Sequence, residues 1–386
     1  MARNRSLQLA ALATVAVPGL NVVATRPPQK VTADFRLCGV LDSAGRHWVV
    51  QAPLHAAAAM AMDAEVQVLR ELDGAARAAS LPFDVVQPEG FAEMPEGWRA
   101  MVYRELSGRE LDIDALTPGP GPSGSLARAI AAVHELDPAS IADAGLPVYD
   151  ASSYRQRRLA EVDDAARTGR VPPVLLGRWE RALEDVALWQ FSECPVHGDL
   201  APENVLVSNG RVAAIINWSN AHVGDPAEDL AWLYTAAPED SLDTIEEAYA
   251  LARSEQPDKH LVDRALLYSE LAVARWLMHG VRIENPEIIS DAEGMLAELA
   301  RQVADSAPIG YSQPVVQAWE VEGSLDPNAT LPNREPDADE YADEYAEDLE
   351  ADDRPEVLDP DATGEIPVIA SGDAAAEDVA TTGSPT

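Results

Sequence analysis

A short loop near the middle of the chain carries the residues best suited to chemistry. It reads His197-Gly198-Asp199 and is followed, five residues after the aspartate, by Asn204. A carboxylate can accept a proton from a reacting hydroxyl group, and an amide oxygen can bind a metal ion. Because a short loop fixes both groups on one wall of a cleft, this spacing predicts a base and a metal ligand that face the same substrate.

A predicted hairpin returns the chain to this loop. The stretch VLVSNGRVAAII contains two β-rich segments separated by Asn209-Gly210, a pair typical of tight hairpin turns. The loop has the spacing of the protein-kinase motif H-R-D-x-x-x-x-N, and the hairpin ends at Asn217, where kinases carry the metal-binding aspartate of D-F-G. We therefore expect Asn204 and Asn217 to form the metal side of the site, with an amide where a carboxylate is usual.

The combination of HGD-x4-N, this hairpin and GDPAEDLAWL resembles the aminoglycoside and macrolide phosphotransferase family. INWSNAHVGDPAEDLA is most similar to the macrolide branch, and LPFDVV, VYRELSG, AIAAVHEL and ELAVARWLMHG extend the similarity over residues 20–300. The resemblance implies a two-lobed, protein-kinase-like α+β fold. It has a small N-lobe that contains a sheet and a larger helical C-lobe.

The resemblance also implies roles for individual residues. Asp199 would be the catalytic base, with a simple turn residue as the alternative, and Asn204 and Asn217 would bind magnesium. The residues expected to support the loop are His197, Asp225 and Asp229. A hydrogen-bonded loop histidine and a helix N-cap are the alternatives for the first two of these. The candidate substrate-side residues are Asn220, Trp276 and His279, of which the last two are equally compatible with helix packing.

The nucleotide side departs from the family pattern. The residues expected there are Gln51, Glu65, Tyr103 and Glu105. The family places a basic residue after the strand WVV, where this chain has Gln51, and no Lys or Arg occurs from His47 to Leu69. Glu65 therefore lacks its expected cation, and ATP and magnesium should bind weakly. We also interpret LCGVLDSAG as a degenerate glycine-rich loop.

Three functions are compatible with these residues. The first is a catalytically impaired phosphotransferase relative with a cleft for ATP-Mg and a small hydroxylated, cationic substrate. The second is an active ATP-dependent O-phosphotransferase that uses Asp199 as its base. The third is a scaffold whose acidic tail binds a basic partner.

Composition sets the domain organisation. We predict an N-lobe at residues 1–105, a helical C-lobe at 106–308 and a disordered acidic tail at 309–386. The boundary between the lobes lies near the Gly- and Pro-rich stretch TPGPGPSG. From Leu331 onward the chain has 18 acidic residues and two arginines, with few apolar residues, which is typical of disorder.

Charge and hydropathy exclude several classes of protein. The formal net charge of −38 excludes nucleic-acid binding, which depends on clustered Lys and Arg. Cys38 and Cys194 form no metal-binding or disulfide pattern. The N-terminal run LQLAALATVAVPGL imitates a secretory signal, but its weakly apolar composition and the following strand favour a helix of a cytoplasmic protein. We expect no membrane span.

Overall fold

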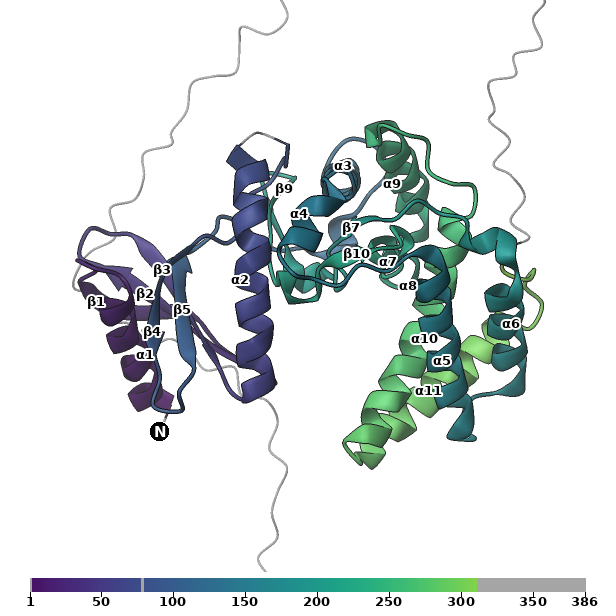
Figure 1. The fold of residues 1–386 in the computed structure, drawn as a ribbon, viewed down its shortest axis with the longest axis horizontal. Coiled ribbons are helices and arrows are strands. Elements are labelled where there is room, and N and C mark those ends of the chain that lie inside the picture. Colours follow the sequence, from purple (N-terminus) through teal and green to yellow (C-terminus); the bar gives the residue numbers. More distant parts are fainter. Residues whose placement is uncertain (1, 78–79, 311–386) are drawn as a thin grey trace, which may run out of the picture. The chain divides into compact units, whose positions relative to one another are not determined.

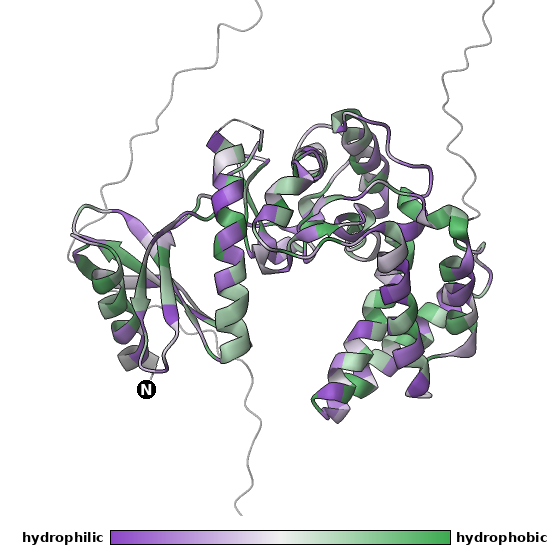
Figure 2. Cartoon of the chain, viewed as in Figure 1, coloured by the Kyte–Doolittle hydropathy of each residue, from purple (hydrophilic) through white to green (hydrophobic). Residues whose placement is uncertain are grey.

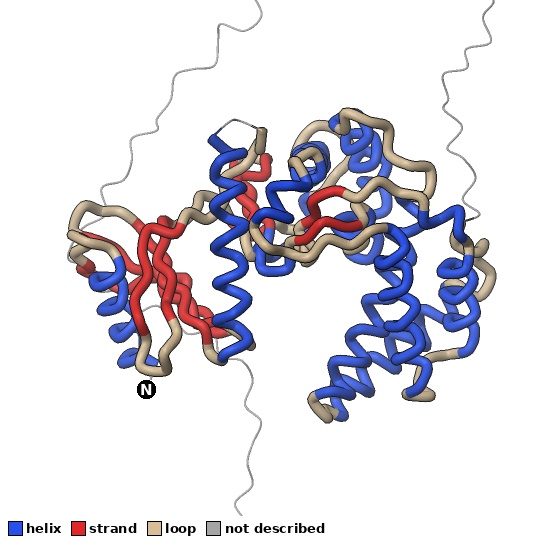
Figure 3. Tube along the Cα trace, viewed as in Figure 1, coloured by secondary structure: helices blue, strands red, loops and turns tan. Residues whose placement is uncertain are grey.

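The computed structural model describes residues 2–77 and 80–310, which belong to one compact unit. Strands gather in the N-terminal part of the chain and helices in the rest (Figure 3). This arrangement confirms the expected α+β fold with a small sheet followed by a larger helical region. The predicted disordered tail, residues 309–386, lies outside the described residues apart from Ile309 and Gly310.

The N-terminal part is built on an antiparallel sheet of five strands in the order β1-β2-β3-β5-β4 (Figure 1). The strands are β1 (Val22–Val31), β2 (Phe35–Asp42), β3 (His47–Pro53), β4 (Pro88–Glu93) and β5 (Arg99–Arg104). Helix α1 (Ala2–Ala16) packs on one face of the sheet, and helix α2 (Ala56–Arg77) covers the other.

The alternation of side chains along β3 places Gln51. Trp48 and Val50 belong to the apolar cluster under α1, whereas Val49 belongs to the larger cluster that includes the buried face of α2. Because successive side chains of a strand point to opposite faces, Gln51 lies on the same face as Val49. The buried residues of α2 include Glu65, so strand and helix present these two polar residues to one side of the sheet.

The helical part contains nine α-helices among the described residues. They are α3 (Pro122–His134), α4 (Pro138–Asp143), α5 (Ala151–Arg167), α6 (Pro173–Glu184), α7 (Ala227–Leu230), α8 (Leu233–Ala236), α9 (Glu239–Ala252), α10 (Leu261–Arg282) and α11 (Pro286–Gln302). Two small sheets interrupt them, β6-β8-β9 and β10-β7. Their strands are β6 (Arg109–Glu110), β7 (Cys194–Val196), β8 (Val205–Ser208), β9 (Arg211–Ile215) and β10 (His222–Gly224).

Local sequence signals explain where several helices begin. The side chains of Asp137, Asp150 and Asn285 accept hydrogen bonds from backbone N–H groups in the first turns of α4, α5 and α11. Such caps satisfy donors that have no partner within the helix. Apolar and polar residues alternate around α5, α10 and α11, as expected of helices with one buried face (Figure 2).

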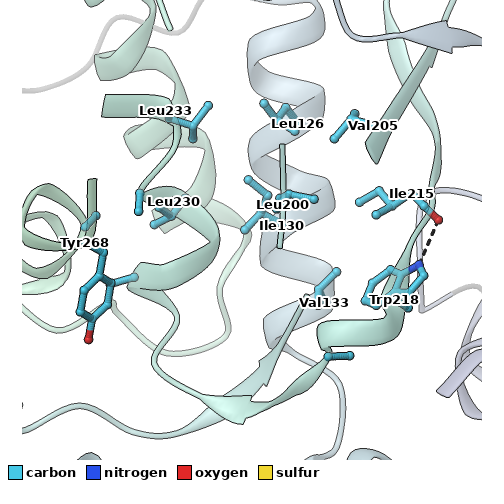
Figure 4. Close-up of a cluster of buried hydrophobic side chains, with 14 of the residues drawn as sticks. Leu126, Ile130, Val133, Leu200, Val205, Ile215, Trp218, Leu230, Leu233 and Tyr268 are labelled. Carbon is cyan, nitrogen blue, oxygen red and sulfur yellow. Dashed lines mark hydrogen bonds between the residues drawn. The ribbon is translucent and has the colours of Figure 1, made fainter. Parts of the chain in front are cut away.

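Helix α3 forms the centre of the core next to the loop that carries the candidate base Asp199. Leu126, Ile130 and Val133 point from α3 toward side chains of the loop, the hairpin and the following helices (Figure 4). The hairpin side includes Trp218, whose Nε1 donates a hydrogen bond of 3.0 Å to the carbonyl oxygen of Ile215. The loop and hairpin therefore rest on a fully buried apolar layer.

Two local features follow from packing. The stretch LCGVLDSAG, interpreted above as a degenerate glycine-rich loop, forms strand β2 and the turn after it, because Cys38 and Val40 are buried against α1. A glycine is required at position 39 because a Cβ there would lie 2.2 Å from the carbonyl oxygen of Pro27. Strand β4 begins only at Pro88, because the backbone of Asp84 pairs with strand β9 instead.

No helix in the described part of the chain combines the length and the apolar character needed to cross a membrane.

The packing of α3 generates a stability prediction. Leu126→Ala removes a fully buried side chain and should lower the free energy of unfolding by about 2–5 kcal/mol. Leu251→Ala, at an 86% exposed position of α9, is the matched control and should change it by less than about 0.5 kcal/mol. Urea denaturation followed by circular dichroism measures both. Equal effects of the two substitutions would contradict the assigned core.

Candidate active site

The loop that carries the candidate base, His197-Gly198-Asp199, follows β7 and requires glycine at its second position. Gly198 has φ 77°, a left-handed conformation that other residues rarely adopt. A Cβ at this position would lie 2.4 Å from the carbonyl oxygen of Asn220 and 2.9 Å from Nδ1 of His222. The loop is therefore closely packed against the segment that precedes β10.

Asp229 of α7 fixes the backbone of this loop. Its carboxylate accepts hydrogen bonds from the N–H groups of His197 (2.7 Å) and Gly198 (2.9 Å), and it lies 3.3 Å from Nε2 of His134. Burial alone would raise the pKa of Asp229, but the contacts with His134 and His197 outweigh it and hold the pKa below its usual range. The ionised carboxylate thus ties the loop to α7 and α3.

His197 contributes a second tie. Its Nε2 lies 2.9 Å from the carbonyl oxygen of Ile216, next to the end of the hairpin. Its Nδ1 accepts a hydrogen bond of 3.3 Å from the N–H of Asp199. The histidine is fully buried, so it links the loop to the hairpin from inside the protein.

Asp225 anchors helix α10 to the start of α7. Its carboxylate accepts hydrogen bonds from Nε (2.6 Å) and Nη2 (3.1 Å) of Arg264, from the Tyr268 hydroxyl (2.6 Å) and from the N–H of Ala227 (3.0 Å). All of these side chains are buried. The hydrogen bond from the N–H of Ala227, at the start of α7, is of the kind that caps a helix. Asp225 also forms a buried ion pair with Arg264.

Asp199 lies exposed on the loop between these anchors. Partial removal from water raises its pKa, and the charges of Glu203 and Glu228 act in the same direction. The charge of His197 and a hydrogen bond from Asn220 oppose this rise. The structure therefore brings the candidate base and the candidate substrate residue Asn220 together.

The two candidate metal ligands are in contact with each other. Nδ2 of Asn217 donates a hydrogen bond of 2.5 Å to Oδ1 of Asn204, and Nδ2 of Asn204 donates one of 2.7 Å to the carbonyl oxygen of Asp199. Asn217 has a left-handed backbone (φ 67°), which asparagine tolerates better than most residues. The oxygen that Asn204 would offer a cation is engaged by the amide of its neighbour.

These side chains do not match the usual ligand set of a magnesium site. Mg²⁺ is usually held by one or two carboxylates, and its sites demand near-octahedral oxygen geometry. Here the two facing side chains are neutral amides, one of which presents an N–H group to the other. Across residues 2–77 and 80–310, no group of three His, Cys, Asp or Glu side chains is arranged to hold a metal ion.

On the nucleotide side, Glu65 is buried and makes a different contact from the expected one. Its Oε1 accepts a hydrogen bond of 2.9 Å from the N–H of Trp218, the residue after Asn217. Burial raises the pKa of Glu65 to about 7. The hydrogen bond from Trp218 lowers the pKa, but by less than burial raises it. Gln51 is also buried, and Tyr103 has a raised pKa because of burial and the charges of Glu65 and Glu105.

Glu105 belongs to a charged cluster at the end of β5. Its carboxylate pairs with Arg26 and lies 3.1 Å from Nδ1 of His47. A cavity of about 560 Å³ opens beside this cluster and is also lined by Arg46 and Arg104. Sequence analysis missed these arginines because they come from β1, the β2–β3 turn and β5, which only the sheet brings together.

Trp276 and His279 lie in a different environment. Their rings stack on α10 with centroids 5.4 Å apart, and Nε1 of Trp276 donates a hydrogen bond of 2.9 Å to Asp291 of α11. Neither lines the pocket next to the catalytic loop, whereas Asn220 does. His279 lines a separate hollow between α5 and α10.

Several supporting residues had no local signal. Arg264 contacts Asp225 across 39 positions of sequence. Tyr249 approaches Nδ1 of His134 at 2.8 Å across 115 positions. A single aspartate or histidine in a sequence does not identify its partner at such separations, so only the folded chain reveals these pairs.

Comparison with known proteins agrees with this geometry. A family model described as a phosphotransferase enzyme family (APH) matches residues 31–263. Viomycin phosphotransferase of Streptomyces vinaceus is 30% identical over 219 residues, which are 52% of this chain and 71% of that protein.

Two solved structures share the fold. The apoenzyme of the macrolide 2'-phosphotransferase MphH from Brachybacterium faecium has a TM-score of 0.63 at 22% identity, covering 75% of this chain and 98% of that one. The GDP complex of aminoglycoside 2'-phosphotransferase-IIIa also has a TM-score of 0.63, at 18% identity, covering 76% and 97%. Because the family match spans more than half of the sequence, the chain belongs to the phosphotransferase enzyme family and has its kinase-like fold.

Proposed function

We propose that this protein is a phosphotransferase relative in which transfer from ATP to a small hydroxylated molecule is strongly attenuated. The observation that carries the proposal is the hydrogen bond from the amide of Asn217 to Oδ1 of Asn204. This bond occupies the oxygen of one expected metal ligand with the N–H group of the other. Both side chains are neutral, so the pair offers a cation no negative charge. In this proposal Asp199 is the retained base, residues 1–105 are the nucleotide side and residues 106–308 carry the base and the substrate.

The size of the loss follows from electrostatics. A pair of unit charges about 4 Å apart at an effective dielectric near 20 is worth about 4 kcal/mol. A barrier raised by this amount slows a reaction by about three orders of magnitude. A carboxylate at position 217 would supply one such interaction with a cation, and a lysine at 51 would supply another with the phosphates. Because both act on the same nucleotide, their effects are coupled and need not add.

The buried Glu65 supports the same conclusion. A carboxyl group buried on the same side of the sheet as Gln51, with burial as the largest influence on its pKa, lacks the compensating charge that a basic residue on β3 would provide. In kinases this pair of lysine and glutamate positions the nucleotide phosphates. We infer that ATP binds weakly here and that magnesium is poorly localised.

We further infer that the protein acts in the cytoplasm.

The two other functions have less support. An efficient transferase would explain why the loop around Asp199 is held by so many buried contacts, but it does not explain the amide pair. A scaffold that binds a basic partner through residues 309–386 rests only on the composition of that segment.

The raised pKa of Glu65 generates the first prediction. Between its ordinary value of 4.5 and about 7 the native state holds a proton that the unfolded state has lost, so stability falls as pH rises through this window. Glu65→Gln keeps an oxygen for the N–H of Trp218 and removes the charge. At pH 8 it should raise the free energy of unfolding by roughly 3 kcal/mol, and at pH 4.5 the gain should be small.

Urea denaturation at both pH values measures this difference. Glu71→Gln, at an exposed position of the same helix, is the control and should have little effect at either pH. If Glu65→Gln is no more stable than the wild type at pH 8, the buried carboxylate has a compensating partner and the proposed charge deficit is wrong.

Restoring the two missing charges tests the proposed function itself. The wild type should transfer phosphate from ATP to macrolide or aminoglycoside acceptors at a rate close to background. Gln51→Lys should tighten ATP about tenfold, because an effect of that size needs only about 1.4 kcal/mol. Gln51→Lys combined with Asn217→Asp should give measurable hydrolysis or transfer, and adding Asp199→Ala should abolish it.

Asn209→Asp provides the matched control for this experiment. Asn209 lies in the same hairpin and also has a positive φ (50°), but it makes the turn rather than facing Asn204. In the Gln51→Lys background it should restore nothing. Brisk transfer by the wild type, or a folded but silent Gln51→Lys, Asn217→Asp variant, would overturn the proposal.

A further inference from the structure

A small cavity opens beside the catalytic loop. It has a volume of about 260 Å³ and is lined by Gly198, which precedes Asp199, by Asn220, which hydrogen-bonds Asp199, and by His222. The other wall comes from α5 and the segment before it. The aromatic and charged residues of that wall are Tyr149, Tyr154, Arg157 and Arg158.

Most charged groups of this cavity neutralise one another. Arg158 donates hydrogen bonds to Glu161 (2.7 and 2.9 Å), to Glu228 (3.0 Å) and to the hydroxyl of Tyr154 (2.8 Å). Glu228 also pairs with Nε2 of His222 at 3.2 Å. Among the described residues, Glu228 is the one acidic residue that lines the cavity. Its charge is shared between Arg158 and His222.

Arg157 is the cation that remains. Its guanidinium lies 4.1 Å from the centroid of the Tyr149 ring, which holds it against the wall. The side chain is exposed, and within the described part of the chain no carboxylate lies within 4 Å of it in an ion pair. A guanidinium with free N–H groups matches carboxylate and phosphate oxygens in two-pronged geometry.

This local charge is opposite to that of the whole chain. The protein has a net charge of −38, yet the wall beside the candidate base presents an uncompensated cation. A polycationic acceptor would bring ammonium groups toward Arg157, and like charges brought together at short distance are unfavourable. The exposed Arg157 therefore favours an anionic group on this wall over the cationic substrate of the first function.

We propose that this cavity binds a small hydroxylated molecule that carries an anionic group, a carboxylate or a phosphate, which pairs with Arg157. The volume is at the lower end of ligand pockets and suits a compact molecule with one ring. With the anion on Arg157 and the ring beside Tyr149, the hydroxyl group lies toward Asp199. The direction of the hydroxyl rests on the proposed role of Asp199, whereas the binding of the anion does not.

Calorimetry with ring compounds that differ in charge tests the inference on the full chain, without nucleotide. The probes are 4-hydroxyphenylacetate, its neutral amide 4-hydroxyphenylacetamide, the cation tyramine and phenyl phosphate. The two anions should bind at least tenfold more tightly than tyramine. The affinity of the neutral amide should lie between that of the anions and that of tyramine. Binding of phenyl phosphate alone would show that the cavity recognises a phosphate group. Binding of both anions would show that it recognises the anionic oxygens that carboxylate and phosphate share.

Two substitutions locate the binding in this cavity. Arg157→Gln should lower the affinity for 4-hydroxyphenylacetate about tenfold and leave the affinity for the neutral amide nearly unchanged. Tyr149→Leu should lower the affinity for both compounds. Arg167→Gln removes an exposed cation at the other end of α5, next to Asp164, and should change nothing.

Tighter binding of tyramine than of the anions, no measurable binding of either anion, or equal binding by wild type and Arg157→Gln would overturn the inference. Because the measurement needs no turnover, it also separates the two proposals. Efficient transfer by the wild type to a neutral or anionic acceptor would refute the attenuated activity and leave the charge preference of the cavity standing.

Discussion

The carboxylate of Asp229 accepts hydrogen bonds from two consecutive backbone N–H groups of the catalytic loop, those of His197 and Gly198. It is almost completely buried, so these charge-assisted bonds form away from water. Gly198 can adopt the required left-handed backbone, and no larger residue would fit against the carbonyl oxygen of Asn220. The position of Asp199 follows from these two constraints, because it is the next residue of the same loop.

The constraints that shape the loop are separate from the charges that serve a nucleotide. Asp229 and the ion pair of Asp225 with Arg264 are satisfied entirely within the helical part of the chain. The buried amide of Asn204 has a partner for each polar atom, because its oxygen accepts from Asn217 and its nitrogen donates to the carbonyl oxygen of Asp199. An amide at position 217 therefore leaves no buried polar atom of Asn204 without a partner. A kinase-like fold therefore tolerates these two neutral positions at little cost in stability, although the electrostatics of phosphoryl transfer would suffer.

Sequence patterns were sufficient for the family and for the order of the elements. The motif of His197, Asp199 and Asn204 and the turn at Asn209-Gly210 each involve residues close together in the sequence. They can therefore be recognised without the structure. The pairing of Asp84 with β9 and the contact of Asp225 with Arg264 join distant segments, and no local pattern encodes such a partner. The roles assigned to the site residues stay predictions, and Trp276 and His279 lie away from the cavity beside Asp199.

Glu65 shows how a charged residue can keep a structural contact after losing its electrostatic partner. An unpaired buried carboxyl is costly, and its raised pKa measures that cost. The same side chain accepts the N–H of Trp218 and so joins α2, which covers the N-terminal sheet, to the end of the hairpin that carries Asn217. A neutral carboxyl can accept this hydrogen bond as well as an ionised one. The tie between the two parts of the site therefore does not depend on a basic residue at position 51, and Gln51 leaves the hydrogen bond between Glu65 and Trp218 in place.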